Sequence, residues 1–321
     1  MNPTPLPALD SVASITQSFA ELGYICTQRV ATAVHIAHRL QRPILVEGPA
    51  GVGKTELAKT TADCIGLPLI RLQCYEGLDE SKALYEWKYA KQLLYTQLLK
   101  DKLSDVLADA KSLDEAVERL HQQGDLFFSE HFLEPRPLLK ALREERGAVL
   151  LIDEVDKSDE EFEAFLLEVL SDFQVSIPEI GTIRSVTRPL VFLTSNNTRE
   201  LSDALKRRCL HLFIPFPEER LERRIVSARL PAATDRLTRQ VVNFIQQVRQ
   251  LDLKKLPSVS ETIDWAQTLM LLSADELDAD MVRDTLGVFL KFEEDLERIE
   301  AQLGTLVSQA HRATQTIAAG S

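Results

Sequence analysis

The chain has 321 residues, of which 45% are hydrophobic and 27% charged, a composition typical of a folded protein with a sizeable core. Its 49 acidic residues exceed its 37 basic residues, and the formal net charge of −12 disfavours a nucleic acid partner. Residues 1–10 lack the basic start and apolar stretch of a secretion signal, and no apolar run is long enough to span a membrane. Four cysteines lie far apart and outside metal-ligand spacing, so we expect reduced thiols in a cytoplasmic protein: Cys26, Cys64, Cys74 and Cys209.

Helix-like and strand-like segments alternate through the first two thirds of the chain. Apolar residues at helical spacing predict two helices over 11–40, interrupted near Gly23. Short apolar runs predict five buried strands, at 43–46, 68–72, 148–152, 189–194 and 210–214. A further helix is predicted over 56–65, between the first two strands. A strand, a glycine-rich turn, a helix and a second strand in succession are typical of a parallel sheet, so the predicted fold class is α/β.

Two segments interrupt this pattern and a third follows it. Residues 76–137 are charged and helical in pattern with no strand signal, which predicts a helical insert in the α/β core. Two strand-like runs on either side of a Pro-Glu-Ile-Gly turn predict a β-hairpin over 174–186. After Pro217 the pattern is helical to the end. We therefore predict an α/β domain over 1–216 and an all-helical domain over 217–321.

The segment after the first predicted strand fits the pattern G-x-x-x-x-G-K-[ST]. In this pattern glycines let backbone amides surround phosphates at a helix N-terminus, the lysine spans the terminal phosphates and the hydroxyl binds Mg²⁺. A chance glycine turn is the alternative, but the position between a strand and a helix is the context that the motif requires. We predict that ATP binds at Gly48, Pro49, Ala50, Gly51, Val52, Gly53, Lys54, Thr55 and Glu56.

Two adjacent carboxylates follow the buried strand at 148–152. The carboxyl ends of parallel strands are where ligands of such sheets bind. Asp153 can therefore hold Mg²⁺ together with Thr55, and Glu154 can orient and polarise an attacking water. A pair of helix-capping carboxylates would be the better interpretation without the phosphate loop. With the loop present, ATP hydrolysis is favoured over binding alone.

Several motifs in the same order resemble those of an AAA+ ATPase of the MoxR branch, and within it the ATPases that accompany carbon monoxide dehydrogenase maturation. They are the phosphate loop, Leu150-Leu151-Ile152-Asp153-Glu154-Val155-Asp156, the hairpin, Thr194-Ser195-Asn196-Asn197 and Ala204-Leu205-Lys206-Arg207-Arg208. The resemblance covers about residues 21–273. It implies a five-stranded sheet ordered 5-1-4-3-2, a C-terminal helical lid, and a hexameric ring with ATP between subunits. It also implies a protein partner with a von Willebrand factor A domain and a metalloenzyme client.

The resemblance implies roles for two further pairs of residues. A polar sensor residue at the end of the strand at 189–194 is Asn196 or Asn197, and we favour Asn196; an Asx turn is the alternative for either. An arginine finger that reaches the γ-phosphate of the next subunit matches Arg208 best and Arg207 second. Without the family context, two arginines at a helix end are ordinary solvent-facing residues.

One position departs from the family pattern. The lid of such proteins usually carries a phosphate-sensing arginine at the start of a helix, where this chain has Glu261. Arg249, Lys254 and Lys255 are candidates to reach the phosphates instead, and a solvated basic helix end is the alternative for all three.

The C-terminal region has apolar residues at alternating spacings of three and four, which is the seam of a helix pair. They are Phe289, Phe292, Leu296, Ile299, Leu303, Leu306 and Ala310. We favour a terminal helix that packs on its own lid over an intermolecular coiled coil, because three heptads are the lower limit for the latter.

The resulting hypothesis is a Mg²⁺-dependent, ring-forming ATPase that remodels a protein client during metalloenzyme maturation. A nucleic acid motor is an alternative, and the net charge of −12 argues against it. A monomeric P-loop kinase for a small molecule is another, but it leaves the arginine pair and the helical region without a role.

Overall fold

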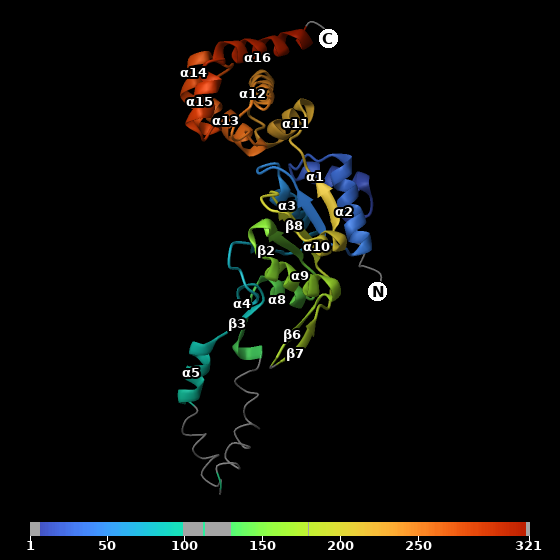
Figure 1. Cartoon of the computed structure of the whole chain (residues 1–321). Helices are drawn as coiled ribbons and strands as arrows, with labels where there is room; N and C mark the ends of the chain where they lie inside the picture. The colour runs from blue at the N-terminus through green and yellow to red at the C-terminus, as the bar shows by residue number, and fades with distance from the viewer. Residues whose placement is uncertain (1–6, 99–111, 113–129, 179, 319–321) are drawn as a thin grey trace.

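The computed structural model describes residues 7–98, 112, 130–178 and 180–318 (Figure 1). The first elements are a short 3-10 helix η1 (Pro7–Leu9), α1 (Val12–Glu21) and α2 (Gln28–Leu40). Ser11 and Thr27 cap α1 and α2 with their side-chain oxygens, and Gly23 has a φ of 78° in the connection, which explains why the predicted helical stretch divides there.

A five-stranded parallel sheet forms the centre of the α/β part. Its strands are β1 (Ile44–Glu47), β2 (Leu69–Gln73), β5 (Val149–Asp153), β8 (Leu190–Ser195) and β9 (Leu210–Phe213). They lie in the order β2-β5-β8-β1-β9, and each neighbouring pair is parallel. When the five strands of this sheet are numbered 1 to 5 in chain order and read from β9 to β2, their order is 5-1-4-3-2. The predicted fold class and strand order are therefore confirmed.

Helices cover both faces of this sheet, which explains why its strands are apolar throughout. Successive residues of a strand point to opposite faces. Val149 and Leu151 pack in the core under α1, α2 and α3 (Lys54–Ile65), whereas Leu150 and Ile152 pack in the core under α8 (Pro137–Arg143) and α9 (Glu160–Asp172). The phosphate loop and the Asp-Glu pair both follow such doubly buried strands, so a rigid sheet positions them.

The insert differs from the prediction. It contains α4 (Glu80–Ala83), β3 (Tyr85–Trp87), α5 (Tyr89–Leu98), η2 (Glu130–Phe132) and β4 (Leu133–Pro135). The expectation that it holds no strand is wrong, because β3 and β4 form an antiparallel pair. Strands of three residues are too short to show a period of two, and their pairing joins segments almost fifty residues apart. Residues 99–111 and 113–129 of the predicted helical insert lie outside the described residues.

The predicted hairpin is present as β6 (Gln174–Ile177) and β7 (Gly181–Arg184), which pair antiparallel. Figure 1 shows the hairpin and the insert extending from the end of the α/β part that lies away from the C-terminal helices. Between β8 and β9 lies α10 (Asp203–Arg208), and η3 (Val155–Lys157) follows β5.

The C-terminal region is helical and has a core of its own. Its helices are α11 (Glu219–Arg229), α12 (Asp235–Val248), α13 (Val259–Leu271), α14 (Ala279–Thr285), η4 (Leu286–Val288), α15 (Glu293–Glu300) and α16 (Leu303–Ala318). Leu303, Leu306 and Ala310 are buried in this core, so the terminal helix packs on its own lid. The seam is broken between α15 and α16, and Phe292 is 43% exposed.

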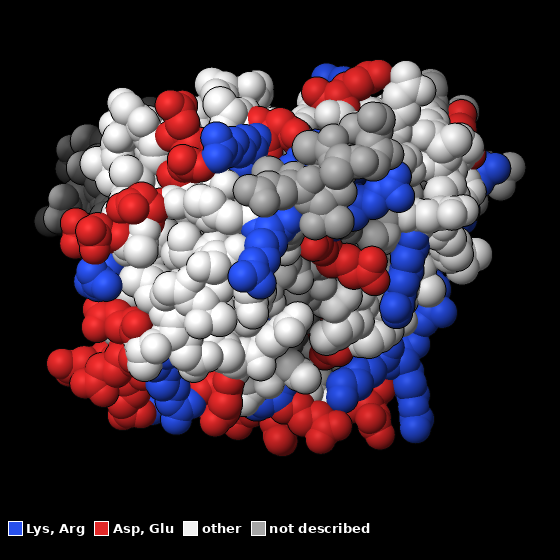
Figure 2. Space-filling model, turned by 90° about the horizontal axis from the view of Figure 1, so that it is seen from above, with Lys and Arg blue, Asp and Glu red and all other residues white. Residues whose placement is uncertain are grey.

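The surface at the lid end carries both signs of charge. Figure 2 shows Lys and Arg interspersed with Asp and Glu over this face. Among the described helices, none is both long enough and apolar enough to cross a bilayer.

Candidate active site

The phosphate loop, residues 48–53, joins β1 to α3 and is shaped by its glycines. Gly48, Gly51 and Gly53 have φ values of 150°, 71° and 95°. A Cβ at Gly48 would lie 2.1 Å from the carbonyl oxygen of Ile214, so the loop approaches the neighbouring backbone more closely than any side chain permits. Gly53 is the N-cap residue of α3, which leaves the first amide groups of this helix free to face an anion.

Lys54 lies at the start of α3 with its side chain folded over the loop. Its Nζ donates to the carbonyl oxygens of Gly48 and Pro49 at 2.8 and 2.7 Å, and to Oδ1 of Asn196 at 2.7 Å. The residue is only 7% exposed. Burial lowers the pKa of this lysine, while nearby carboxylates, led by Asp156, oppose the shift. The cation is thus held beneath the loop.

Asp153 lies at the carboxyl end of β5 and accepts hydrogen bonds from two hydroxyl groups. Thr55 Oγ1 donates to its Oδ1 and Oδ2 at 3.0 and 3.2 Å, and Thr194 Oγ1 donates to Oδ1 at 2.5 Å. Arg71 forms an ion pair with Oδ2 at 2.5 Å. The carboxylate is 2% exposed, so these contacts replace the water that it loses.

Glu154 has a left-handed backbone with a φ of 57°, and it turns its side chain toward β2 and β8. Its Oε2 accepts from Gln73 Nε2 at 2.9 Å and pairs with Lys157 Nζ at 2.6 Å. Its Oε1 lies 3.4 Å from Nδ2 of Asn196. A non-glycine residue in this region is uncommon and often marks a functional site. The carboxylate is held at the same edge of the sheet as Lys54.

The two candidate sensor residues have different positions. Asn196 lies between Lys54 and Glu154 and bonds to both. Asn197 has a φ of 62°, and its backbone N–H donates to Ser195 Oγ at 2.9 Å, so the turn here is a serine turn and not one closed by an asparagine side chain. In the part of the chain that the structure describes, Asn196 is therefore the member of this pair whose side chain contacts the predicted catalytic carboxylate.

Asp156 fixes the loop that carries these asparagines. Its Oδ2 accepts from the backbone N–H of Asn196 at 3.2 Å, and from the N–H and Oγ1 of Thr198 at 2.9 and 2.7 Å. Burial alone would raise the pKa of Asp156, but these hydrogen bonds outweigh it and lower the pKa below its usual value.

The two candidate finger arginines are exposed at the end of α10, apart from this cluster. Arg208 Nε donates to Ser171 Oγ at 2.7 Å, and the carbonyl oxygens of Arg207 and Arg208 accept from Arg42 at 2.7 and 3.3 Å. Within the described residues, neither guanidinium contacts Lys54 or Glu154 of its own chain. Both side chains are accessible to a neighbouring molecule.

The lid touches the phosphate loop directly. The backbone N–H of Ser260, at the start of α13, donates to the carbonyl oxygen of Gly51 at 3.3 Å, and Arg229 of α11 pairs with Glu56 at 2.6 Å. Glu261, at the expected sensor position, completes a capping box with Ser258.

The structure gives structural partners to all three basic residues proposed as substitutes for the lid sensor. Arg249 forms a buried ion pair with Glu222, Lys254 pairs with Glu294, and Lys255 pairs with Glu261. For Arg249 the solvated helix end proposed as an alternative is also wrong, because its side chain is 6% exposed.

The residues present fit a nucleotide with Mg²⁺. Thr55 and Asp153 offer one hydroxyl and one carboxylate beside a loop that presents backbone N–H groups, and the remaining ligands would be phosphates and water. In the described part of the chain, no group of three His, Cys, Asp or Glu side chains could hold a metal by itself. Oxygen ligands in this small number suit Mg²⁺, which keeps several waters and binds through phosphates.

Sequence reasoning missed several residues of the site. Arg71 and Gln73 lie two apart on β2 and so face the same side, where they contact Asp153 and Glu154. Polar residues at alternate positions of an otherwise apolar strand were the available signal. Thr194 was noted only as part of a motif, and the contact of Lys157 with Glu154 follows from its helical spacing of three.

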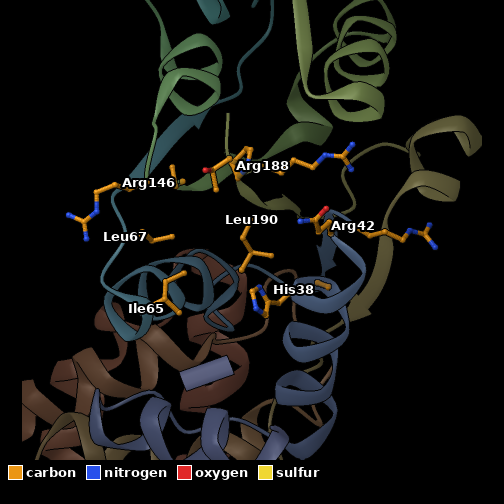
Figure 3. Close-up of a pocket in the computed structure, with 13 residues that line it drawn as sticks. His38, Arg42, Ile65, Leu67, Arg146, Arg188 and Leu190 are labelled. Atoms are coloured by element: carbon orange, nitrogen blue, oxygen red, sulfur yellow. The ribbon is translucent and has the colours of Figure 1, made fainter. Parts of the chain in front are cut away.

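A separate cavity of about 130 Å³ lies at the amino ends of β5 and β8, whereas the candidate active site lies at the carboxyl ends of the strands. Figure 3 shows His38 directed into it, whereas the charged ends of Arg42, Arg146 and Arg188 point away. With its basic groups turned outward, this cavity does not have the character of a phosphate site.

Residues 43–209, just over half of the chain, match the family model described as "AAA domain (dynein-related subfamily)". Uncharacterized protein SAB1265c of Staphylococcus aureus is 25% identical over 66% of this chain and 70% of its own length, and uncharacterized protein SH1500 of Staphylococcus haemolyticus is 24% identical over 73% and 78%. Among solved structures, the Thermotoga maritima RuvB Holliday junction branch migration motor is 17% identical, with a TM-score of 0.44 over 87% of this chain and 72% of that one. The matched span includes the phosphate loop and the Asp-Glu pair, and the chain belongs to the dynein-related subfamily of AAA domain proteins.

Proposed function

We propose that this protein is an ATP-hydrolysing AAA+ machine that remodels a protein client. The observation that supports hydrolysis is the convergence of Lys54, Thr55, Asp153, Glu154 and Asn196 at the carboxyl edge of three neighbouring strands. Each group has a distinct chemical role there. Separate residues for phosphate binding, metal binding and water activation are what phosphoryl transfer to water requires.

The roles follow from the contacts of the side chains. Lys54 and the N–H groups of the loop bind the phosphates, and Thr55 and Asp153 would hold Mg²⁺, which supplies charge neutralisation when bound. Glu154 accepts hydrogen bonds on both carboxylate oxygens, which hold it in a position to orient a water and draw on its proton. Asn196 links the cation under the phosphates to this carboxylate, which suits a sensor of the γ-phosphate.

The exposed arginines of α10 support assembly as a ring. An arginine that acts on the γ-phosphate of another subunit has to be free of its own site, and Arg208 meets this condition in the described residues. We propose a hexamer in which Arg208, or Arg207 in its place, reaches the site of the neighbour. By the resemblance to the MoxR branch, the partner would carry a von Willebrand factor A domain and the client would be a metalloenzyme, with a carbon monoxide dehydrogenase as the leading case.

The test of hydrolysis is the substitution Glu154→Gln. The amide keeps the shape and can still accept one hydrogen bond, but it cannot draw on a proton of the water. We expect ATP binding near the wild-type level and loss of turnover by at least about a hundredfold, the range of general base catalysis. Wild-type phosphate release by the variant would contradict the assignment. Asn197→Ala is the matched control, because among the described residues this side chain makes no hydrogen bond with Lys54 or Glu154.

A further inference from the structure

Arg71 connects the two carboxylates of the candidate active site. Its Nη2 donates to Asp153 Oδ2 and to Gln73 Oε1, each at 2.5 Å. The amide of Gln73 is thereby turned so that its Nε2 donates to Glu154 Oε2 at 2.9 Å. A continuous chain of hydrogen bonds therefore runs from the metal-binding carboxylate to the water-activating one, and both linking residues come from β2.

The charge of Asp153 explains why a cation is needed at this place. The carboxylate is 2% exposed, and a buried charge is costly unless it is paired. Thr55 and Thr194 contribute neutral hydroxyl groups, while Lys54 directs its ammonium to Asn196 and the carbonyl oxygens of the loop. In the described part of the chain, the ion pair that Asp153 makes is with Arg71.

We propose that Arg71 is the resident counter-cation of Asp153, and that it gives up this carboxylate when a divalent cation binds with the nucleotide. The inference rests on the proposed ATPase function and goes beyond it by coupling metal binding to the catalytic carboxylate. The guanidinium and a divalent cation use the same carboxylate, and a dication at Asp153 repels a guanidinium only a few Å away. The side chain of Arg71 is 49% exposed, so it has solvent to turn into.

The release of Arg71 also changes the contacts of Glu154. Without the guanidinium, the amide of Gln73 is no longer oriented by a bond to its oxygen. Glu154 keeps its contacts with Lys157 and Asn196 but loses a directed partner on the β2 side. Arg71 is thus a positioning residue, through which a divalent cation at Asp153 frees the carboxylate that activates water.

The experiment is a Mg²⁺ titration of nucleotide binding, which needs no turnover. Binding of a fluorescent, non-hydrolysable ATP analogue is followed at rising Mg²⁺ in the full chain, in wild type, Arg71→Met and Arg71→Lys. Removal of one positive charge from a partly solvated metal site predicts a fall of about fivefold in the half-saturating Mg²⁺ concentration of Arg71→Met. Arg71→Lys keeps the charge and should stay near wild type.

A matched control and a second variant complete the design. Arg236→Met removes an exposed lid arginine that pairs with Glu276, and it should leave the Mg²⁺ midpoint unchanged. If Arg71→Met does not fold, Arg71→Gln removes the charge with a polar side chain and should show the same fall. An unchanged or higher Mg²⁺ midpoint in a folded variant without the charge overturns the role of Arg71. A wild-type protein that binds no nucleotide at any Mg²⁺ concentration overturns the proposed function itself.

Discussion

Replacement of Arg249 by methionine tests whether this arginine supports the lid or senses the nucleotide. In the structure, Arg249 Nη1 and Nη2 donate to the two carboxylate oxygens of Glu222 at 2.6 and 2.7 Å. The side chain of Arg249 is 6% exposed, and that of Glu222 is fully buried. We expect Arg249→Met to destabilise the lid and to leave nucleotide affinity of the folded protein unchanged.

The magnitude follows from what the substitution leaves behind. Among the described residues, the side-chain donors that remain to Glu222 are neutral, namely Gln246 Nε2 at 2.6 Å and Thr262 Oγ1 at 2.8 Å. Breaking a buried pair by removing one partner typically costs about 3–5 kcal/mol, because the remaining charge is uncompensated. Methionine retains an apolar contact with Phe216, over whose ring the guanidinium lies at 4.8 Å. The expected loss of unfolding free energy is therefore dominated by the charge of Glu222.

The assay is urea unfolding followed by tryptophan fluorescence. The chain has two tryptophans, and Trp265 is fully buried in the lid core, so a Trp87→Phe background makes the signal report on the lid. The double variant Arg249→Met with Glu222→Met should recover most of the lost stability, since apolar residues in place of a buried pair are often neutral.

Two results would refute this reasoning. A double variant as unstable as Arg249→Met would show that the stranded carboxylate is not the cause of the loss. A folded Arg249→Met that no longer binds nucleotide would show that the arginine acts on the phosphates, contrary to its buried position beside Glu222.

Three further outcomes are expected. Lys54→Ala should weaken ATP binding by about ten- to a hundredfold in an equilibrium titration, because it removes the cation that faces the phosphates, and unchanged affinity would contradict its role. Arg208→Ala should bind ATP but hydrolyse it poorly. When it is mixed with Glu154→Gln, and labelled protomers verify that subunits exchange, some turnover should return, because a mixed ring contains interfaces with both groups intact. Wild-type turnover of the single Arg207→Ala and Arg208→Ala variants would refute the ring mechanism. Hydrogen bonds from Thr198 and Asn196 outweigh burial and lower the pKa of Asp156 in the folded protein, so its contribution to stability is full at pH values above the ordinary pKa of an aspartate and is lost as the pH falls through the lowered, folded pKa. The stability difference between wild type and Asp156→Asn should therefore shrink only in that acidic range, and a decline already near neutral pH would point to another group.

Local pattern was sufficient for the elements whose signal lies within a few residues. Strands buried on both faces are short apolar runs, and the phosphate loop is a contiguous motif whose glycines the backbone requires at φ values of 71° and 95°. The Asp-Glu pair follows directly from the end of β5, because the carboxyl ends of parallel strands lie at one edge. The break between α1 and α2 was visible for the same reason, in Gly23 and its neighbours.

The tertiary structure decided contacts between segments far apart in the chain. Arg71 and Gln73 reach Asp153 and Glu154 across about eighty residues, and no local periodicity specifies which polar residue of β2 meets which carboxylate. The β3–β4 pair was invisible for a related reason, since a three-residue strand is stable only when a distant partner supplies its hydrogen bonds.

The basic residues of the lid also show which properties the sequence reveals and which depend on the tertiary structure. Their charge is evident from the sequence, but whether a cation faces a phosphate or a buried carboxylate depends on the packing of helices around it. The interior of the lid places Glu222 beside Arg249, and desolvation of that carboxylate fixes the arginine there. Composition and motif therefore determined the chemistry available to this protein, whereas burial and long-range pairing determined which charged groups are free to act on the nucleotide.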